Sequence, residues 1–594
     1  MYLVRYLVHS ITCPLTHGIV LSVILAIVPT HAWAESVKQR LAVSVSGVEE
    51  DVYRNVLAHL SLSAASKKKE MLSETAARQL YERADAEIKT ALQAFGYYQP
   101  KVQATFEKDK KWKVDLKVSP GPQTLLREVM IEFHGEGREN EKFTALLQES
   151  GLKSGTALLH DNYTTFKSAL ENTAYELGYL DAKYRSHEIK VYPIDQAADV
   201  ALHFDTGPRY FFGSITIQQE TLEPEFIARY VKAKAGDPFE TRSLVNLQLR
   251  LTETNYFDRV RIDIQREQSI DRHIPVTIVA SPRKPSAYNF SAGFGTDTGP
   301  RLGVQADYRR VNSKGHRFHN QLEVSAVQSS LVSQYLIPID DVSSEYVDFT
   351  ANVEHERVND VDSVQYRIGT SINENRWGGR SRLGLEYLAE NWSFGDESNE
   401  SAVLLIPSVE FTRKQSDNTF FPTRGYSYTA RLLGGVDSVL SDVTFAQVQL
   451  FAKAVFPVTA RSRLLLRSEI AATESDNFNA LPPSLRFYAG GAASVRGYGY
   501  KDLSPTDSAG NLIGGKYLTT ISAEIDYLVV DNFGLAAFVD AGDATDNPFD
   551  SFSVGAGLGL RYRSPAGMLR LDIAHPFDDP DNDFRIHISF GIDL

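Results

Sequence analysis

From residue 286 to residue 594, apolar and polar residues alternate in short segments that are separated by Gly, Asn, Asp and Ser turns. A period of two residues is typical of a strand with one apolar and one polar face. Transmembrane β-barrels have an even number of such strands, each ~9–11 residues long. We therefore predict a 16-stranded barrel over 286–594; a soluble β-sandwich is the alternative. The sixteen predicted strands lie at 286–296, 300–311, 315–328, 330–338, 345–356, 362–375, 380–392, 402–413, 425–437, 442–456, 461–474, 515–529, 532–542, 551–563, 567–577 and 583–594.

The last predicted strand shows the period most clearly. Its apolar residues would face lipid and the residues between them would face the lumen, since successive side chains of a strand point to opposite faces. The predicted lipid-facing set is Ile586, Ile588, Phe590, Ile592 and Leu594, and the predicted lumen-facing set is His587, Ser589, Gly591 and Asp593.

Helical and strand periods are mixed in the first half of the chain, which divides into three similar modules at 35–120, 121–207 and 208–283. Each is predicted to contain a strand, an amphipathic helix that ends at a turn-forming residue, and two further strands. The turn-forming residues are Gly96, Gly178 and Asn255, and at Gly96 we expect a left-handed helix end. Repetition at a fixed period favours α+β repeats over a single α/β enzyme domain. Edge strands of such modules can pair with extended peptides, so the modules are candidate docking surfaces.

Residues 1–34 have the pattern of a signal peptide. Arg5 precedes an apolar run over 19–28, and Ala32-Trp33-Ala34 is an A-x-A cleavage site. A membrane anchor is the alternative, but ten apolar residues are too short to cross ~30 Å of hydrocarbon. The single cysteine, Cys13, lies inside this segment, so we expect the exported chain to contain no disulfide.

Composition narrows the class of protein. The chain of 594 residues has 75 acidic and 62 basic side chains, a formal net charge of −13, and 43% hydrophobic residues. This polarity excludes a bundle of transmembrane helices, each of which needs ~20 mostly apolar residues. The acidic balance argues against nucleic acid as a partner, because nucleic-acid binders carry basic patches.

The longest connection between predicted strands, about 475–514, joins strands 11 and 12 and contains Arg496. If the modules lie in the periplasm, strand 1 rises from that side and this connection is the sixth external loop. A loop folded into the lumen would bury the Arg496 cation, which then needs acidic partners. Strand parity points Glu524 and Asp540 into the lumen. An exposed surface arginine is the alternative.

Strand 14 contributes a stripe of glycines to the same wall of the predicted lumen. Gly555, Gly557 and Gly559 all point inward by parity. Without side chains, they leave room for the backbone of the loop to lie close to the wall.

Val495, Arg496, Gly497 and Tyr498 form a motif in this loop, and here the sequence resembles the BamA/TamA superfamily of outer-membrane protein insertases. The resemblance covers nearly all of the exported chain. It implies that the repeats are polypeptide-transport-associated (POTRA) modules and that the rest is the family's sixteen-stranded barrel. Three modules and a chain of this length are most similar to the TamA branch. In the family the motif arginine docks on acids at positions equivalent to Glu524 and Asp540.

The resemblance also implies a function, a cellular location and partners. The protein would be an outer-membrane assembly factor, not an enzyme, that helps to fold, insert and translocate outer-membrane proteins such as autotransporters. Its modules would lie in the periplasm and bind client proteins or a TamB-like, inner-membrane-anchored periplasmic partner. The barrel would contact the lipid bilayer and lipopolysaccharide. In the family, a role in lipid transport has also been proposed for TamA together with its partner TamB.

A lateral seam between the first and last strands is the mechanism that we expect. The predicted seam residues are Gly293, Gly295, Phe590, Gly591 and Leu594. The glycines weaken strand pairing. A seam that opens would expose unpaired edges, which can template an incoming strand.

Catalytic, metal and cofactor motifs are not found in the sequence: it has no G-x-S-x-G, H-E-x-x-H or G-x-x-x-x-G-K-[ST]. His316 and His319 lie near a turn and are expected to be polar turn or lumen residues, not metal ligands. No cofactor is expected. Two rival functions remain: a two-partner-type secretion pore for a dedicated exoprotein, and a barrel enzyme such as a lipase or protease.

Overall fold

The computed structural model describes residues 38–594, except 70, 109–110, 341, 343 and 580–582. The predicted signal peptide, its cleavage site and Cys13 lie outside the described residues. The described chain forms two compact units. The first unit ends at Pro208 but does not include Tyr175–Leu180, and the second comprises Tyr175–Leu180 and Arg209–Leu594.

The three modules repeat one topology, as predicted. In each, a central strand pairs in parallel with the module's opening strand and antiparallel with a third strand. The sheets have the orders β2-β1-β4-β3, β5-β7-β6 and β8-β10-β9. The strands are β1 (Gln39–Ser46), β2 (Met71–Leu72), β3 (Lys101–Lys108), β4 (Trp112–Ser119), β5 (Leu125–His134), β6 (Lys183–Tyr192), β7 (Ala197–Asp205), β8 (Phe211–Gln218), β9 (Phe257–Ile264) and β10 (His273–Pro282).

Helices pack against one face of each sheet and bury apolar stripes. Ile88 and Leu92 on α3, Leu170 on α5 and Leu251 on α7 are all fully buried. Gly96, Gly178 and Asn255 follow these three helices with φ of 81°, 84° and 63°, so the predicted left-handed end at Gly96 is confirmed. The helices are α1 (Glu50–His59), α2 (Ser61–Lys67), α3 (Glu74–Gln93), α4 (Glu141–Glu149), α5 (His160–Glu176), α6 (Pro224–Ala228) and α7 (Thr241–Glu253), with a short 3₁₀ turn, η1 (Arg266–Gln268).

One helix per module was expected, but the structure adds α1 and α2 to the first module, α4 to the second and α6 to the third. These helices are short, and α4 buries only Phe143. Too few apolar positions lie on each of them for a helical period to emerge from the sequence.

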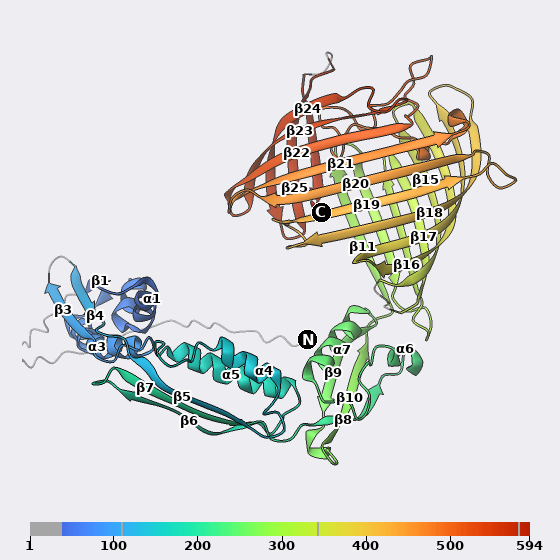
Figure 1. Cartoon of the computed structure of the whole chain (residues 1–594). Coiled ribbons are helices and arrows are strands. Elements are labelled where there is room, and N and C mark those ends of the chain that lie inside the picture. Colours follow the sequence, from blue (N-terminus) through green and yellow to red (C-terminus); the bar gives the residue numbers. More distant parts are fainter. Residues whose placement is uncertain (1–37, 70, 109–110, 341, 343, 580–582) are drawn as a thin grey trace, which may run out of the picture. The chain divides into compact units, whose positions relative to one another are not determined.

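Sixteen antiparallel strands form the nearly closed barrel of the second half, and each strand pairs with the next in sequence (Figure 1). All sixteen predicted strands are present. The strands are β11 (Ser286–Gly295), β12 (Gly299–Tyr308), β13 (Arg317–Ser325), β14 (Gln328–Pro338), β15 (Tyr346–Val358), β16 (Val361–Arg376), β17 (Gly379–Phe394), β18 (Glu400–Ser416), β19 (Gly425–Gly435), β20 (Phe445–Pro457), β21 (Ser462–Ser475), β22 (Tyr517–Val530), β23 (Phe533–Thr545), β24 (Ser553–Ser564), β25 (Gly567–Pro576) and β26 (Arg585–Gly591).

Apolar side chains along these strands point outward, as the alternation predicts. On β22, for example, Ile521 and Ile525 are 53% and 45% exposed, whereas Glu524 between them is 8% exposed. An apolar outer face with buried charge inside is the arrangement of a membrane barrel. Within the described residues, no helix has both the length and the apolar character needed to cross a membrane.

The third module is tied to the barrel by contacts within the second unit. The Tyr256 hydroxyl donates to the carbonyl of Gly315, in the turn between β12 and β13. Arg229 donates to the carbonyl of Ile339 at 2.8 Å, in the turn between β14 and β15. The third module is therefore hydrogen-bonded to two turns at one rim of the barrel.

The end of the chain corrects one prediction. β26 stops at Gly591, so Ile592, Asp593 and Leu594 do not continue the strand. Leu594 is 8% exposed and does not face lipid. Alternation in the sequence continues past the last paired residue, and for that reason it overstated the strand's length.

Candidate functional site in the barrel lumen

The connection between β21 and β22 folds back onto the inner wall of the barrel. It contains two short 3₁₀ turns, η2 (Phe478–Ala480) and η3 (Pro483–Leu485). Arg467 on β21 donates to the Ser494 carbonyl at 2.6 Å, and the Ala492 amide donates to Asp297 at 2.9 Å. The loop therefore contacts both β21 and the turn that follows β11.

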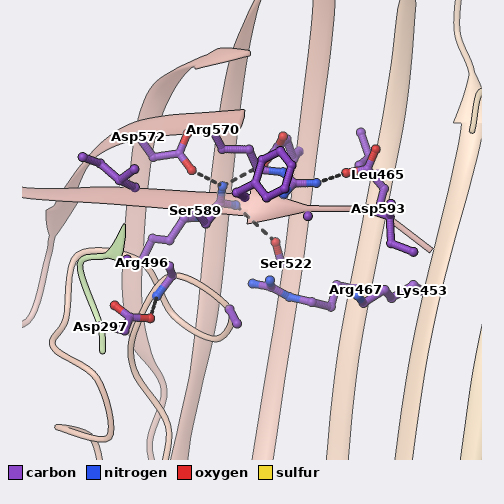
Figure 2. Close-up of a pocket in the computed structure, with 18 of the residues that line it drawn as sticks. Asp297, Lys453, Leu465, Arg467, Arg496, Ser522, Arg570, Asp572, Ser589 and Asp593 are labelled. Atoms are coloured by element: carbon purple, nitrogen blue, oxygen red, sulfur yellow. Dashed lines mark hydrogen bonds and ion pairs between the residues drawn. The ribbon is translucent and has the colours of Figure 1, made fainter. Parts of the chain in front are cut away.

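Arg496 is 4% exposed and bonds to three acidic side chains. Its Nε and Nη2 donate to the two Asp540 carboxylate oxygens at 2.7 and 3.0 Å, and its backbone amide donates to Asp540 at 3.1 Å. Its Nη1 donates to Glu524 at 2.7 Å and to Asp572 at 3.2 Å. Figure 2 shows Arg496 with Asp572 and Ser522 beside it. The structure thus places both acids chosen by strand parity on Arg496.

A second arginine, which the sequence reasoning missed, completes the cluster. Arg561 on β24 is 2% exposed and donates twice to Glu524, at 2.7 and 2.9 Å, and to Asp572 at 2.5 Å. Glu524 and Asp572 therefore bridge the two guanidinium groups. The sequence pattern does not give the strand register. It therefore could not predict which inward residues of β24 and β25 lie beside Glu524.

Charge and geometry make this cluster a fixed anchor. Two cations and three anions lie together out of water, and charges buried in this way are stable only when they are paired and hydrogen-bonded. The two-point Arg496–Asp540 contact also fixes orientation, because a guanidinium matches a carboxylate as a planar fork. The Arg496 guanidinium carbon lies 3.4 Å from the centre of the Phe538 ring, which adds a cation–π contact.

The other motif residues position the loop. Val495 is fully buried. Gly497 has φ of 105°, a conformation that favours glycine, and its amide donates to His587 Nε2 on β26 at 3.0 Å. The Tyr498 hydroxyl donates to the Val554 carbonyl at 3.2 Å.

The predicted glycine stripe on β24 is where the loop approaches the wall. A Cβ at Gly555 would overlap the carbonyl oxygen of Arg496, and a Cβ at Gly559 would overlap the Asp572 carboxylate. A Cβ at Gly557 would overlap the Ile573 carbonyl on the neighbouring strand. Two of the three glycines therefore make room for the cluster itself.

The barrel sheet is open between β26 and β11. Every other neighbouring pair of strands from β11 to β26 forms a ladder, and none joins these two among the described residues. The Ile588 amide donates to the Thr296 hydroxyl at 3.2 Å, a side-chain contact in place of a backbone ladder. β26 is also short, with seven residues against ten in β11.

A cavity of about 390 Å³ lies on the lumen side of this opening. Its lining joins the seam strands to the loop anchor, as Figure 2 shows in part. It is lined by Phe294, Gly295, Phe590, Gly591, Arg496, Lys453, Arg467 and Arg570, among others.

Comparison with known proteins gives the family. A model of the Omp85 superfamily domain matches residues 286–593, more than half of the chain. The chain belongs to the Omp85 superfamily. A second model, the POTRA domain named TamA domain 1, matches residues 42–120.

Among curated relatives, the outer membrane protein assembly factor BamA of Nitratidesulfovibrio vulgaris is 23% identical over 77% of this chain and 58% of its own length. BamA of Neisseria meningitidis serogroup B is 24% identical over 69% of this chain and 56% of its own length. The chain thus spans little more than half the length of these relatives. The structure of Haemophilus ducreyi BamA lacking POTRA domains 1–3 matches 78% of this chain and 99% of that chain, with 16% identity and a TM-score of 0.68.

This Omp85 protein is an outer-membrane barrel with its POTRA modules on the periplasmic side. The contacts of the third module with the turns after β12 and β14 therefore mark the periplasmic rim. The connection between β21 and β22 then starts from the opposite, external rim.

Four of the five residues predicted for the seam lie at the opening of this Omp85 barrel, and Leu594 does not. Gly293 and Gly295 lie on β11, and Phe590 and Gly591 lie at the end of β26. Leu594 instead lies beside β18 and β19: its carbonyl accepts from Lys414 at 2.6 Å, and its side chain lies against Gly425.

Asp593 explains why the end of the chain turns inward after β26. Asp593 pairs with Arg463 at 2.8 Å and with Arg570. Arg463 is 3% exposed, and it also pairs with Asp526 at 2.8 Å. This ionic cluster holds Asp593 and Leu594 inside the barrel, whereas the side chain of Ile592 is 43% exposed.

The remaining sequence expectations concern histidines. His316 contacts the Tyr335 hydroxyl at 2.7 Å, and His319 contacts Asp307 at 2.5 Å. The two histidines therefore contact different partners and do not form one site. The lumen cluster itself consists of paired ions that position the loop.

Proposed function

We propose that this protein is an outer-membrane assembly factor that uses the opening between β11 and β26 to fold and insert client β-barrel proteins. The observation that carries the proposal is that, among the described residues, no ladder joins these two strands, whereas all other neighbouring strands of the sheet are paired. The relatives named above as assembly factors support the same class of function. On this view the chain is not an enzyme.

Physical chemistry explains how such an opening would act. In the part of the chain that the structure describes, no ladder satisfies the backbone N–H and C=O groups on the seam-facing edge of β11, and unsatisfied backbone groups are costly in a bilayer. An incoming client strand satisfies them by adding to the edge. Gly293 and Gly295 lower the pairing strength of β11, so that a client strand can also leave.

The anchored loop has a supporting role in this proposal. Arg496 ties the loop to β22, β23 and β25 through its three acids. Gly497 connects the same loop to β26 through His587. We infer that these contacts hold β22, β23, β25 and β26 in place while β11 is free to separate from β26.

The POTRA modules would receive the client or a periplasmic partner. Every described module sheet ends in two edge strands, which can add an extended segment. The match of residues 42–120 to a TamA domain supports the finer proposal of a TamB-like, inner-membrane-anchored partner and of autotransporters among the clients.

Reconstitution tests the function. The purified chain is placed in phospholipid vesicles, and a urea-denatured outer-membrane β-barrel protein is added from outside. We expect the client to insert faster than into empty vesicles or into vesicles that hold an unrelated barrel, as measured by its heat-modifiable migration on a gel. Equal rates in all three vesicle types would contradict the proposal.

The rival function as a secretion pore gives different results in the same vesicles. A pore would pass a soluble protein into the vesicle interior and would show stable single-channel conductance without accelerating barrel insertion. Depletion in cells provides the second test, since an assembly factor predicts the loss of particular outer-membrane proteins. Loss of a single secreted protein would favour the pore.

A further inference from the structure

Three side chains with metal-binding atoms meet on the exposed face of the second POTRA sheet. Glu132 and His134 lie on β5, and His203 lies on β7, which pairs in parallel with β5. In this register Glu132 is directly opposite His203, and His134 is two residues further along the same face. The opposite face of β7 is the buried one, with Leu202 and Phe204 fully enclosed.

The donor atoms of these residues converge. Oε2 of Glu132 lies 3.1 Å from Nδ1 of His203 and 3.5 Å from Nε2 of His134. One donor atom from each residue falls within 4.8 Å of the others. The two imidazole rings lie nearly parallel, with 15° between their planes and 6.0 Å between their centres.

We propose that Glu132, His134 and His203 form a binding site for a divalent transition-metal ion, with Zn²⁺ the ion that fits best. Zn²⁺ binds imidazole nitrogen and carboxylate oxygen at ~2.0–2.2 Å, and donors at the corners of a tetrahedron of that size lie roughly 3.3 Å apart. The distances of 3.1 and 3.5 Å from Glu132 bracket this value.

The donor set selects against the common hard cations. Mg²⁺ and Ca²⁺ prefer sites made of oxygen ligands alone, whereas imidazole favours Zn²⁺, Cu²⁺ and Ni²⁺. Two of the three donors here are imidazoles. Both strands are also paired along their length, so the protein would bind the ion without folding around it.

The fourth coordination position would be open to solvent. Asp205 lies opposite His134 in the ladder, but its carboxylate already accepts from Arg185 at 2.6 and 3.0 Å and from the Gly207 amide at 3.0 Å. The side chains of Glu132, His134 and His203 are 49%, 33% and 26% exposed, so water can reach the ion. Three protein ligands with an open position resemble an exchangeable site rather than a closed structural one.

Zn²⁺ titration of the tag-free full chain, purified in detergent and stripped with a chelator, tests the proposal by calorimetry. We expect one Zn²⁺ site per chain. His134→Gln and His203→Gln should each weaken it by at least about tenfold, because even changes outside the ligand sphere commonly weaken metal sites by that factor. His187→Gln is the matched control: His187 is an exposed histidine on β6 of the same sheet and is not in the cluster.

Co²⁺ provides a readout that shows the ligands directly. The Co²⁺-loaded chain should give the visible absorption of a four-coordinate site, and His134→Gln and His203→Gln should abolish it while His187→Gln leaves it. Circular dichroism confirms that each variant is folded. Absence of Zn²⁺ binding, or binding that the two cluster variants leave unchanged, would overturn the proposal.

Discussion

Replacement of Arg496 by methionine should destabilise the barrel through one particular residue, Asp540. Methionine keeps much of the length of the side chain and removes its charge. Among the described residues, the hydrogen bonds to the Asp540 carboxylate all come from Arg496, whereas Glu524 and Asp572 are also held by Arg561. The substitution therefore removes the ion pair and both side-chain hydrogen bonds of a fully buried carboxylate, which keeps only the hydrogen bond from the backbone amide of residue 496.

The expected cost follows from this geometry. Breaking a buried ion pair by removing one partner costs about 3–5 kcal/mol, because the remaining charge stays buried. Combining Arg496→Met with Asp540→Asn removes that charge, so the double variant should recover about 1–3 kcal/mol relative to Arg496→Met alone, the size of coupling found between contacting charges.

The assay is equilibrium unfolding by guanidinium in phospholipid vesicles, followed by tryptophan fluorescence and by heat-modifiable migration. Arg357→Met is the matched control, because Arg357 also contacts an aspartate, Asp362, through Nε and Nη2 while its side chain is 67% exposed. An exposed pair of this kind contributes about 0–1 kcal/mol. The reasoning is refuted if Arg496→Met costs no more than the control, or if the double variant is less stable than the single one.

Two further substitutions test contacts of the loop and of the third POTRA module. Gly555→Ala forces a Cβ onto the Arg496 carbonyl, so we expect a loss of about 1–3 kcal/mol in the same unfolding assay; Gly591→Ala, with no atom within 4 Å of the new Cβ, should change little, and equal effects would contradict the steric argument. Burial raises the pKa of Tyr256, which therefore stays protonated and donates to Gly315. Tyr256→Phe should cost about 0.5–1.5 kcal/mol and speed amide hydrogen exchange in the turn after β12, whereas unchanged exchange would show that this bond does not hold the turn.

Local pattern predicted the strands and modules well, because each depends on a short-range period. All sixteen barrel strands follow from alternation, and the helix ends at Gly96, Gly178 and Asn255 follow from single residues that tolerate positive φ. The short helices α1, α4 and α6 were not predicted, because one or two buried residues do not make a helical period.

Features that depend on strand register could be predicted only in part. Parity gave Glu524 and Asp540 as inward acids, since it asks only which way a side chain points. Arg561 and Asp572 also point inward, but their place beside Glu524 depends on the stagger between β22, β24 and β25.

The sequence pattern also did not predict which distant strands pair, or where the last strand ends. His134 and His203 come together only because β5 and β7 pair in parallel across the whole second module. At the end of the chain the pattern misled, because alternation continues through Leu594 after the backbone has turned toward Arg463 and Lys414.

The central claim is that clients enter between β11 and β26, and a reversible lock across this opening tests it most directly. Thr296→Cys and Ile588→Cys place one thiol on each side of the opening, at the two residues whose hydroxyl and backbone amide are in contact, and the thiols are joined by oxidation or by a short bifunctional thiol reagent. Val304→Cys and Leu322→Cys form the control, because β12 and β13 are already paired at these residues.

The measurement is the rate at which vesicles holding each cross-linked protein insert a denatured outer-membrane barrel. We predict that the lock across the opening abolishes the acceleration, that reduction of its disulfide restores it, and that the control lock has no effect. Full activity of the protein locked between β11 and β26 would contradict the account.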